Sequence, residues 1–186
     1  TKKMKISILL PYKENFSPVY PGAVSLFVKD TANLSKYKKN IIVYGNTNYK
    51  KRFKIKYYNI ALSSFKFTSK SKQYVNKFIK LEEKTPSDLI EIHNRPNYLS
   101  DIVNTLGKKN LVLYFHNDPL TMTGSKSINE RKFLLKNCYK IIFNSNWSKK
   151  RFLEGMHDKF VNSEKLLVIF QSAKQLPVNI KKKKKE

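Results

Sequence analysis

Two of the three histidines each follow a short apolar run and stand shortly before a proline. His93 ends the segment Asp88-Leu-Ile-Glu-Ile-His, and His116 follows Leu111-Val-Leu-Tyr-Phe. A run that is apolar at nearly every position is typical of a strand that is covered on both faces of a parallel α/β sheet. Ligands of open α/β sheets bind at the carboxyl ends of the strands. We therefore predict that His93 and His116 lie at neighbouring strand ends and face one site.

Further polar residues follow each histidine. Asn117 and Asp118 come directly after His116, and Asn94 and Arg95 come after His93. Several polar groups in succession after a buried strand need hydrogen-bond partners, and a ligand can supply them. Asn117 and Asp118 are therefore candidate substrate-binding residues, although both residue types can also satisfy themselves within a turn.

Arg95 and Gly22 are the two other candidate binding residues. Arg95 could meet an anionic or hydroxylated ligand, or it could neutralise Asp101 or Asp118. Gly22 lies between the first predicted strand and the first predicted helix, where α/β proteins bring backbone amides against phosphate. A tight turn explains this glycine equally well.

The elements that position these residues alternate along the chain between strand and helix patterns. Strands are predicted at Lys5 to Leu10, at 40–44, 53–60, 88–93, 110–116, 140–144 and 165–170. Helices are predicted from Gly22 to Leu34 and at 69–84, 97–106, 128–137 and 146–154. Segment 53–60 alternates like a half-exposed edge strand. This order predicts an α/β fold with a doubly wound, Rossmann-like parallel sheet and right-handed crossovers.

The length and composition favour a single globular domain. The chain has 186 residues, of which 40% are hydrophobic, and its apolar runs are far shorter than the roughly 20 residues that span a bilayer. Its single cysteine, Cys138, excludes an internal disulfide and fits a reducing cytoplasm. We predict one domain over residues 4–175, with 176–186 as a linker or the truncated start of a second domain.

The formal net charge of +25 is carried almost entirely by lysine. Of 38 basic residues only four are arginine, Arg52, Arg95, Arg131 and Arg151, so 34 are lysine. Nucleic-acid readers rely on arginine for its planar fork, and we therefore expect no nucleic-acid partner. The lysine excess is explained by compositional bias or by docking on an anionic membrane leaflet, for which the lysine-rich face of helix 69–84 is the candidate.

Several catalytic signatures are absent from the sequence. It contains no G-x-G-x-x-G, no G-x-x-x-x-G-K-[ST] and no G-x-S-x-G, which argues against a nucleotide-dependent oxidoreductase. His93, His116, His157 and Cys138 show no zinc-ligand spacing, and we expect no metal.

As an ordered set, these motifs resemble the N-terminal half of a family 4 glycosyltransferase of the GT-B fold. The resemblance covers nearly the whole chain. It is carried by Ile8-Leu-Leu-Pro, Pro21-Gly-Ala, Ile92-His-Asn-Arg-Pro, Tyr114-Phe-His-Asn-Asp-Pro, Met122 with Gly124 and Ser125, Glu130-Arg131, Ile142-Phe-Asn-Ser-Asn-Trp with Arg151-Phe152, and Leu167-Val-Ile-Phe. The glycine loop departs from the family pattern, with Pro-Gly-Ala in place of Gly-Gly, which leaves one fewer unencumbered backbone approach to a diphosphate.

The resemblance implies a retaining enzyme that moves a sugar from a nucleotide-sugar donor to a glycan or glycolipid, as in polysaccharide assembly. This half would bind the acceptor, and a second domain would hold the donor, so the chain alone would show little activity. His116 would contact the donor sugar as a catalytic residue, the helix start at Gly22 would face the diphosphate, and His93 with Arg95 would orient the acceptor. The implied enzyme needs no cofactor, is cytoplasmic and could dock on the inner face of the membrane.

A different class of function stays open from the residues alone. The lysines could serve a stand-alone basic binding module for anionic lipid or nucleic acid. Steep loss of binding with salt, without any response to nucleotide sugars, would distinguish such a module from an enzyme half.

Overall fold

The computed structural model describes residues 4–64, 67–107 and 110–171. Within these ranges seven strands form one sheet in the order β3-β2-β1-β4-β5-β6-β7. The strands are β1 (Ile6–Leu9), β2 (Ile41–Gly45), β3 (Tyr57–Asn59), β4 (Leu89–His93), β5 (Leu111–Phe115), β6 (Lys140–Phe143) and β7 (Leu166–Val168). All six neighbouring pairs are parallel, which confirms the predicted doubly wound, Rossmann-like sheet.

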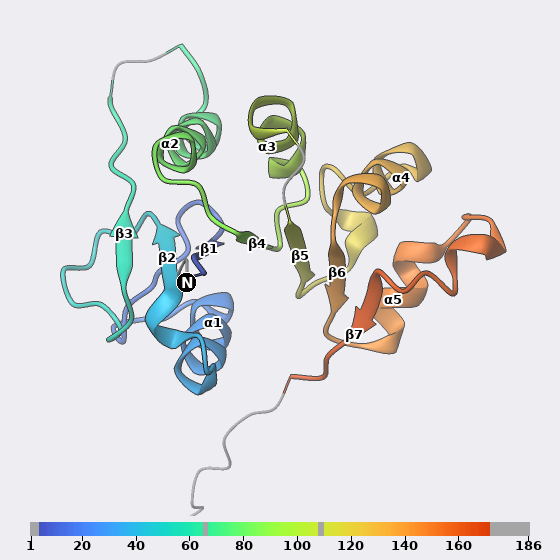
Figure 1. Cartoon of the computed structure of the whole chain (residues 1–186), viewed down its shortest axis with the longest axis horizontal. Coiled ribbons are helices and arrows are strands. Elements are labelled where there is room, and N and C mark those ends of the chain that lie inside the picture. Colours follow the sequence, from blue (N-terminus) through green and yellow to red (C-terminus); the bar gives the residue numbers. More distant parts are fainter. Residues whose placement is uncertain (1–3, 65–66, 108–109, 172–186) are drawn as a thin grey trace, which may run out of the picture.

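The helices form a layer on each face of the sheet. They are α1 (Ala23–Leu34), α2 (Lys70–Lys84), α3 (Tyr98–Leu106), α4 (Ile128–Asn137) and α5 (Asn146–Leu153). In Figure 1, α1 lies below the row of strands, and α2, α3 and α4 lie above it. Phe152 of α5 packs against Phe115 and Phe143, within the core that α2 and α3 also cover. On the opposite face of the sheet α1 packs on β1 and β2 and, through Phe27, on β4 and β5.

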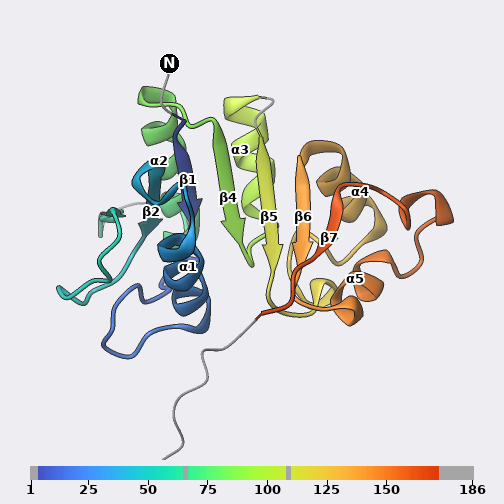
Figure 2. The ribbon, with the colours of Figure 1, turned by 60° about the horizontal axis from the view of Figure 1, so that its bottom comes forward.

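The chain changes direction across the sheet between β1 and β4. It runs from β1 outward through β2 to β3, and α2 then returns it to β4 on the other side of β1. Ligands of doubly wound folds bind outside the carboxyl ends of the strands at such a switch point. Figure 2 shows the strand arrowheads of β1, β4 and β5 pointing toward one edge. The candidate residues after β4 and β5 lie on that edge.

Alternation along β4 and β5 decides which side chains share a face. Ile90 and Ile92 belong to the main core, whereas Leu89 packs with Val112 and Tyr114 in a small cluster that includes Phe27 of α1. Because side chains alternate along a strand, Glu91 and His93 lie on the α1 face with Leu89.

Two predicted strands are shorter in the structure than in the sequence pattern. The expected edge strand 53–60 reduces to Tyr57–Asn59, which pair with Val43 to Gly45 of β2, whereas Phe53 and Ile55 pack into the core without joining the strand. The expected strand 165–170 reduces to Leu166–Val168, which pairs with β6 up to Phe143. The predicted linker, 176–186, lies outside the described residues.

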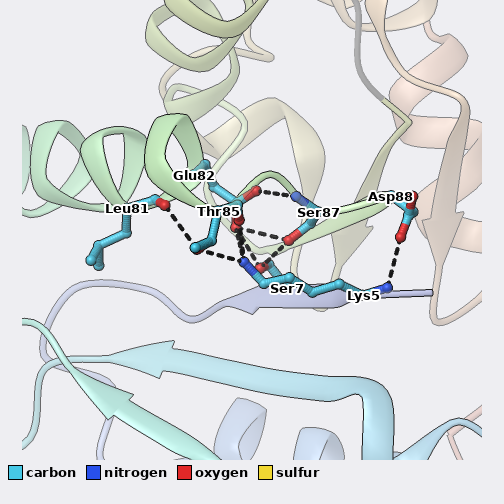
Figure 3. A network of polar contacts seen from close by, with 7 residues as sticks. All are labelled: Lys5, Ser7, Leu81, Glu82, Thr85, Ser87 and Asp88. Atoms are coloured by element: carbon cyan, nitrogen blue, oxygen red, sulfur yellow. Dashed lines mark hydrogen bonds and ion pairs between the residues drawn. The ribbon is translucent and has the colours of Figure 1, made fainter. Parts of the chain in front are cut away.

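A buried carboxylate ties α2 to β1 at the opposite edge of the sheet (Figure 3). Glu82 is 1% exposed, and its Oε1 accepts hydrogen bonds from the hydroxyls of Ser7 (2.6 Å) and Ser87 (2.9 Å). Its Oε2 accepts from the Ser87 backbone amide at 2.8 Å, and Lys5 Nζ lies 3.6 Å from Oε1. Buried polar groups are tolerated when they are paired in this way. Glu82 therefore stabilises the scaffold at a distance from the candidate site.

Candidate functional site

His93 and His116 lie side by side at the ends of β4 and β5. His93 Nδ1 is 2.8 Å from His116 Nε2, and the ring centroids are 5.2 Å apart. The prediction that the two imidazoles occupy neighbouring strand ends is confirmed. Their exposures differ: His93 is completely buried, whereas His116 is partly exposed. Of these two, His116 is thus the histidine that a ligand can reach, whereas His93, predicted to orient the acceptor, has no exposed surface in this structure.

Two further side chains extend this pair into a hydrogen-bonded chain. Glu91 Oε1 lies 2.5 Å from His93 Nε2, since both residues project from the same face of β4. At the other end, Gln171 Nε2 lies 2.6 Å from His116 Nδ1. The series of hydrogen bonds therefore runs from Glu91 through both imidazoles to Gln171, which is exposed.

Aromatic rings from α1 and β5 hold the imidazoles in place. Phe27 of α1 meets the His116 ring edge-on at a centroid distance of 5.0 Å and an interplanar angle of 74°. Tyr114 stacks on His93, also at 5.0 Å, with an interplanar angle of 6°. These contacts restrict the side-chain torsions of His93 and His116.

Asparagine side chains from both neighbouring strand ends fix the backbone of His116. Asn94 Oδ1 accepts from the His116 amide at 3.1 Å, and Asn144 Nδ2 donates to the His116 carbonyl at 2.9 Å. Asn94 has a positive φ of 55°, a conformation that asparagine tolerates better than most residues. Its Nδ2 also donates to Asn117 Oδ1 at 2.8 Å. The predicted substrate-binding residue Asn117 thus belongs to the frame around His116, while its side chain stays exposed.

Asp118 and Arg95 have different surroundings. Asp118 Oδ1 accepts from the Leu120 amide at 3.0 Å, and its carboxylate pairs with Arg151, so turn chemistry and an ion pair both engage it. Arg95 donates to the Asn94 carbonyl at 2.7 Å. The alternative that Arg95 neutralises Asp101 or Asp118 is wrong within the described residues. Asp101 pairs with Lys72 and Asp118 pairs with Arg151. Direct contact of Asp118 and Arg95 with substrate stays a prediction.

The helix start at Gly22 already holds an anion, the carboxylate of Glu14. Glu14 Oε1 accepts from the Ser25 amide in the first turn of α1 at 2.9 Å. A Cβ at Gly22 would lie only 1.9 Å from the same oxygen, so glycine is required for this approach. A negative charge is favoured at a helix N-terminus. A diphosphate bound at this helix start would compete with Glu14.

The surroundings of His116 keep its imidazole neutral. Burial and, to a lesser extent, the neighbouring His93 together lower the pKa of His116 to about 3. A neutral imidazole has one donor and one acceptor nitrogen. His116 can therefore offer a ligand a hydrogen bond without carrying charge at physiological pH.

This pKa predicts a specific dependence of stability on pH. Between pH 6.5 and pH 3 the unfolded chain protonates His116 while the folded chain does not, so acidification favours the unfolded state. From pH 7 to pH 5, wild type should lose about 2 kcal/mol of unfolding free energy relative to His116→Gln. Urea unfolding of both proteins at several pH values measures the difference. A difference that does not change with pH would show that His116 titrates normally in the folded protein.

Metal and thiol chemistry find no support in the described part of the chain. Among residues 4–64, 67–107 and 110–171, no three His, Cys, Asp or Glu side chains are grouped as a metal would need. The expectation that no metal takes part stays a prediction. Cys138 is buried, and this burial raises its pKa to about 12, so it is not an activated nucleophile.

The site also contains residues that the sequence did not predict as site residues, among them Glu91, Asn94, Phe27 and Gln171. Glu91 had a readable signal, because it is a carboxylate that interrupts an apolar strand two residues before His93. The repeated asparagine after β4, β5 and β6 was also visible as a pattern. Phe27 and Gln171 gave no local signal, since only the tertiary fold brings them to His116.

Comparison with known proteins identifies the fold. No family model and no curated protein matches the chain. Among solved structures, Anabaena HepE in complex with UDP and glucose matches with a TM-score of 0.60 and 20% identity, over 91% of this chain and 45% of HepE. HepE in complex with UDP-glucose matches with a TM-score of 0.56 and 18% identity, over 88% and 43%. UDP-N-acetylglucosamine 2-epimerase from Rickettsia bellii matches at 0.50 and 17%, over 89% and 44%.

These matches define the class of fold and the extent of the similarity. The chain has the Rossmann-like architecture of one half of a GT-B fold. It spans less than half the length of each of these solved chains.

Proposed function

We propose that this domain is the acceptor-side half of a glycosyltransferase that uses a UDP-sugar and retains the anomeric configuration. The observation that carries the proposal is the neutral, rigidly held His116 at the carboxyl edge of β5, beside the switch point of the sheet. HepE, which shares this fold, was crystallised with UDP, glucose and UDP-glucose. The resemblance of the sequence motifs to those of family 4 glycosyltransferases supports the same class.

In this proposal His116 contacts the transferred sugar. A hydrogen bond from a sugar hydroxyl to a neutral imidazole orients the donor without adding charge beside the reacting centre. The diphosphate leaving group gains negative charge during transfer, and the N-terminal end of α1 is suited to stabilise it. Because Glu14 occupies that helix end, displacement of its carboxylate is part of donor binding in this scheme.

The acceptor is placed beyond Arg95 on the same edge of the sheet. A cavity of about 430 Å³ opens there between the first turn of α3 and the start of α4. It is lined by Pro96, Asn97, Ser100, Thr123, Gly124, Asn129, Glu130 and Phe133. Gly124 allows the cavity wall to approach α3, since a Cβ there would lie 2.5 Å from the Asn97 nitrogen. We propose a glycan or lipid-linked glycan as acceptor, as in polysaccharide assembly.

A transfer assay with the polypeptide in its full natural length tests this function. UDP release from a UDP-sugar should require an acceptor and yield a glycoside with the donor's anomeric configuration, whereas residues 1–186 alone should give no transfer. Acceptor-independent conversion of UDP-N-acetylglucosamine would indicate an epimerase instead. Failure to consume any UDP-sugar across a panel of glycan and glycolipid acceptors would contradict the proposal.

A lipid-linked acceptor requires the enzyme to reach a membrane. In the described ranges no helix is long and apolar enough to cross a bilayer. Tyr74 and Phe78 of α2 are fully buried, so these rings face the core and are not available to insert into lipid. Lys72 pairs with Asp101, and Lys70 and Lys77 donate to backbone carbonyls. We propose that the exposed Lys80 and Lys84 of α2 mediate electrostatic docking of a cytoplasmic enzyme on an anionic leaflet.

Vesicle binding tests this docking surface. Each basic residue near an anionic leaflet contributes about 1 kcal/mol. The double change Lys80→Gln with Lys84→Gln should therefore weaken binding to phosphatidylglycerol vesicles about 30-fold at physiological salt. Lys149→Gln with Lys150→Gln on α5 is the matched control. Cosedimentation that is absent in wild type, or reduced equally by both pairs, rules out docking through α2.

A further inference from the structure

Four side chains at the candidate site form one uninterrupted series of hydrogen bonds. The series joins Glu91 Oε1 to His93 Nε2 at 2.5 Å, His93 Nδ1 to His116 Nε2 at 2.8 Å, and His116 Nδ1 to Gln171 Nε2 at 2.6 Å. Every ring nitrogen of the two histidines is therefore engaged. The proposed function uses His116 alone and leaves the rest of the series without a role.

The chemistry of Glu91 sets the direction of the whole series. A carboxylate accepts hydrogen bonds and donates none, so His93 Nε2 must carry the hydrogen of that contact. In a neutral imidazole the other nitrogen is then an acceptor, so His93 Nδ1 accepts from His116 Nε2–H. His116 Nδ1 is left with a lone pair. Gln171 can donate through its nitrogen or accept through its oxygen, so it follows this direction and does not set it.

Packing alone does not determine which nitrogen of His116 carries the hydrogen. Phe27, Tyr114 and the asparagine bonds to the backbone fix where the His116 ring lies, but they do not choose which ring nitrogen carries the hydrogen. The tautomer of His116 is set by its hydrogen bond to His93, which is fully buried and shielded from competing water. A partner of this kind commonly fixes the tautomer of a functional histidine.

We infer that Glu91 and His93 are positioning residues that hold His116 in its Nε2–H tautomer, so that Nδ1 is a permanent hydrogen-bond acceptor at the site. Gln171 fills that acceptor in this structure. Resting on the proposed function, the inference also names the group that replaces Gln171: a sugar hydroxyl that donates to Nδ1. Acceptor-only groups, such as an ether oxygen or a phosphate oxygen, would be rejected at this position.

The tautomers are directly observable by nitrogen NMR of the ¹⁵N-histidine-labelled chain. Only three histidines are present, and His157→Gln and His116→Gln assign their signals. At pH 7 the wild-type spectrum should show His93 and His116 as neutral Nε2–H tautomers. An Nδ1–H tautomer or an imidazolium at His116 would overturn the inference without any further variant.

Substitution of Glu91 tests whether its carboxylate sets the tautomers of both histidines. Glu91→Leu removes the acceptor and should switch both histidines to the Nδ1–H tautomer, while Glu83→Leu on exposed α2 surface should leave both unchanged. Glu91→Gln is the second variant in case leucine prevents folding, and its amide, which can also donate, should give a mixture of both tautomers. A folded variant of either kind with wild-type tautomers alone overturns the role of Glu91.

These spectra separate the inference from the proposed function, because they need no substrate. In the full-length protein, predicted tautomers together with a His116 that does not respond to UDP-sugars would leave the positioning role intact and contradict the proposed function. A His116 that responds to UDP-sugars in the Nδ1–H tautomer would contradict the positioning role alone.

Discussion

His116→Ala in the full-length protein is expected to lower turnover by at least two orders of magnitude while leaving the fold intact. A hundredfold loss corresponds to about 2.7 kcal/mol of transition-state stabilisation. The reason is that His116 is partly exposed at the strand edge and its acceptor nitrogen meets no core residue. Its loss removes a contact to the reacting sugar, together with the ring contacts to Phe27 and Tyr114 and the hydrogen bond to His93. Steady-state kinetics with a UDP-sugar and acceptor measure the effect.

The control for this change is His157→Ala. His157 is exposed and caps a short helical turn before Lys159, far along the chain from β4 and β5. Its removal should leave turnover unchanged. Wild-type turnover in His116→Ala, or a collapsed melting temperature, would instead assign His116 a structural role.

Glu82→Ala should give the largest loss of stability among single changes to polar residues at the far edge of the sheet. It removes three hydrogen bonds and leaves Ser7 and Ser87 without the carboxylate they share. Truncating one partner of a buried polar network costs more than the net value of its bonds, because the remaining groups stay desolvated. We expect a decrease of about 3 kcal/mol in the free energy of unfolding.

Urea unfolding of Glu82→Ala beside Glu83→Ala isolates this effect. Glu83 is the next residue of α2 and is exposed, so its change alters helix propensity and charge in the same way without touching the network. Equal losses in the two variants would mean that the buried network contributes nothing specific. Unchanged UDP-sugar binding per folded molecule is expected in both, since Glu82 lies at the edge of the sheet opposite His116.

Much of the fold was predictable because local patterns and tertiary structure agree. The helix Ile128–Asn137 has the predicted bounds, and a capping box between Ser127 and Glu130 fixes its start. The strand before His116 has the continuous apolar character that burial on both faces demands. The edge strand was overestimated because the apolar alternation at Phe53 and Ile55 reflects packing against the core, whereas pairing with β2 begins only at Tyr57.

The position of the candidate site was predictable from the sequence, but several of its residues were not. His93 and His116 could be placed together because parallel neighbouring strands end at one edge. Glu14 and Phe27 could not, since a loop and a helix deliver them from other parts of the chain. The Gly22 prediction illustrates the limit: the helix start was located correctly, but only the structure shows Glu14 bound there.

The placement of the transferred sugar at His116 is tested most directly by following His116 Nδ1 during a titration with UDP-glucose. In the full-length, ¹⁵N-histidine-labelled protein, the Nδ1 resonance should move in a saturable manner as the sugar hydroxyl replaces Gln171, while His157 stays unchanged. UDP alone should produce a smaller change, because it lacks the sugar. A His116 resonance that does not move although UDP-glucose is bound would contradict the placement of the transferred sugar at His116.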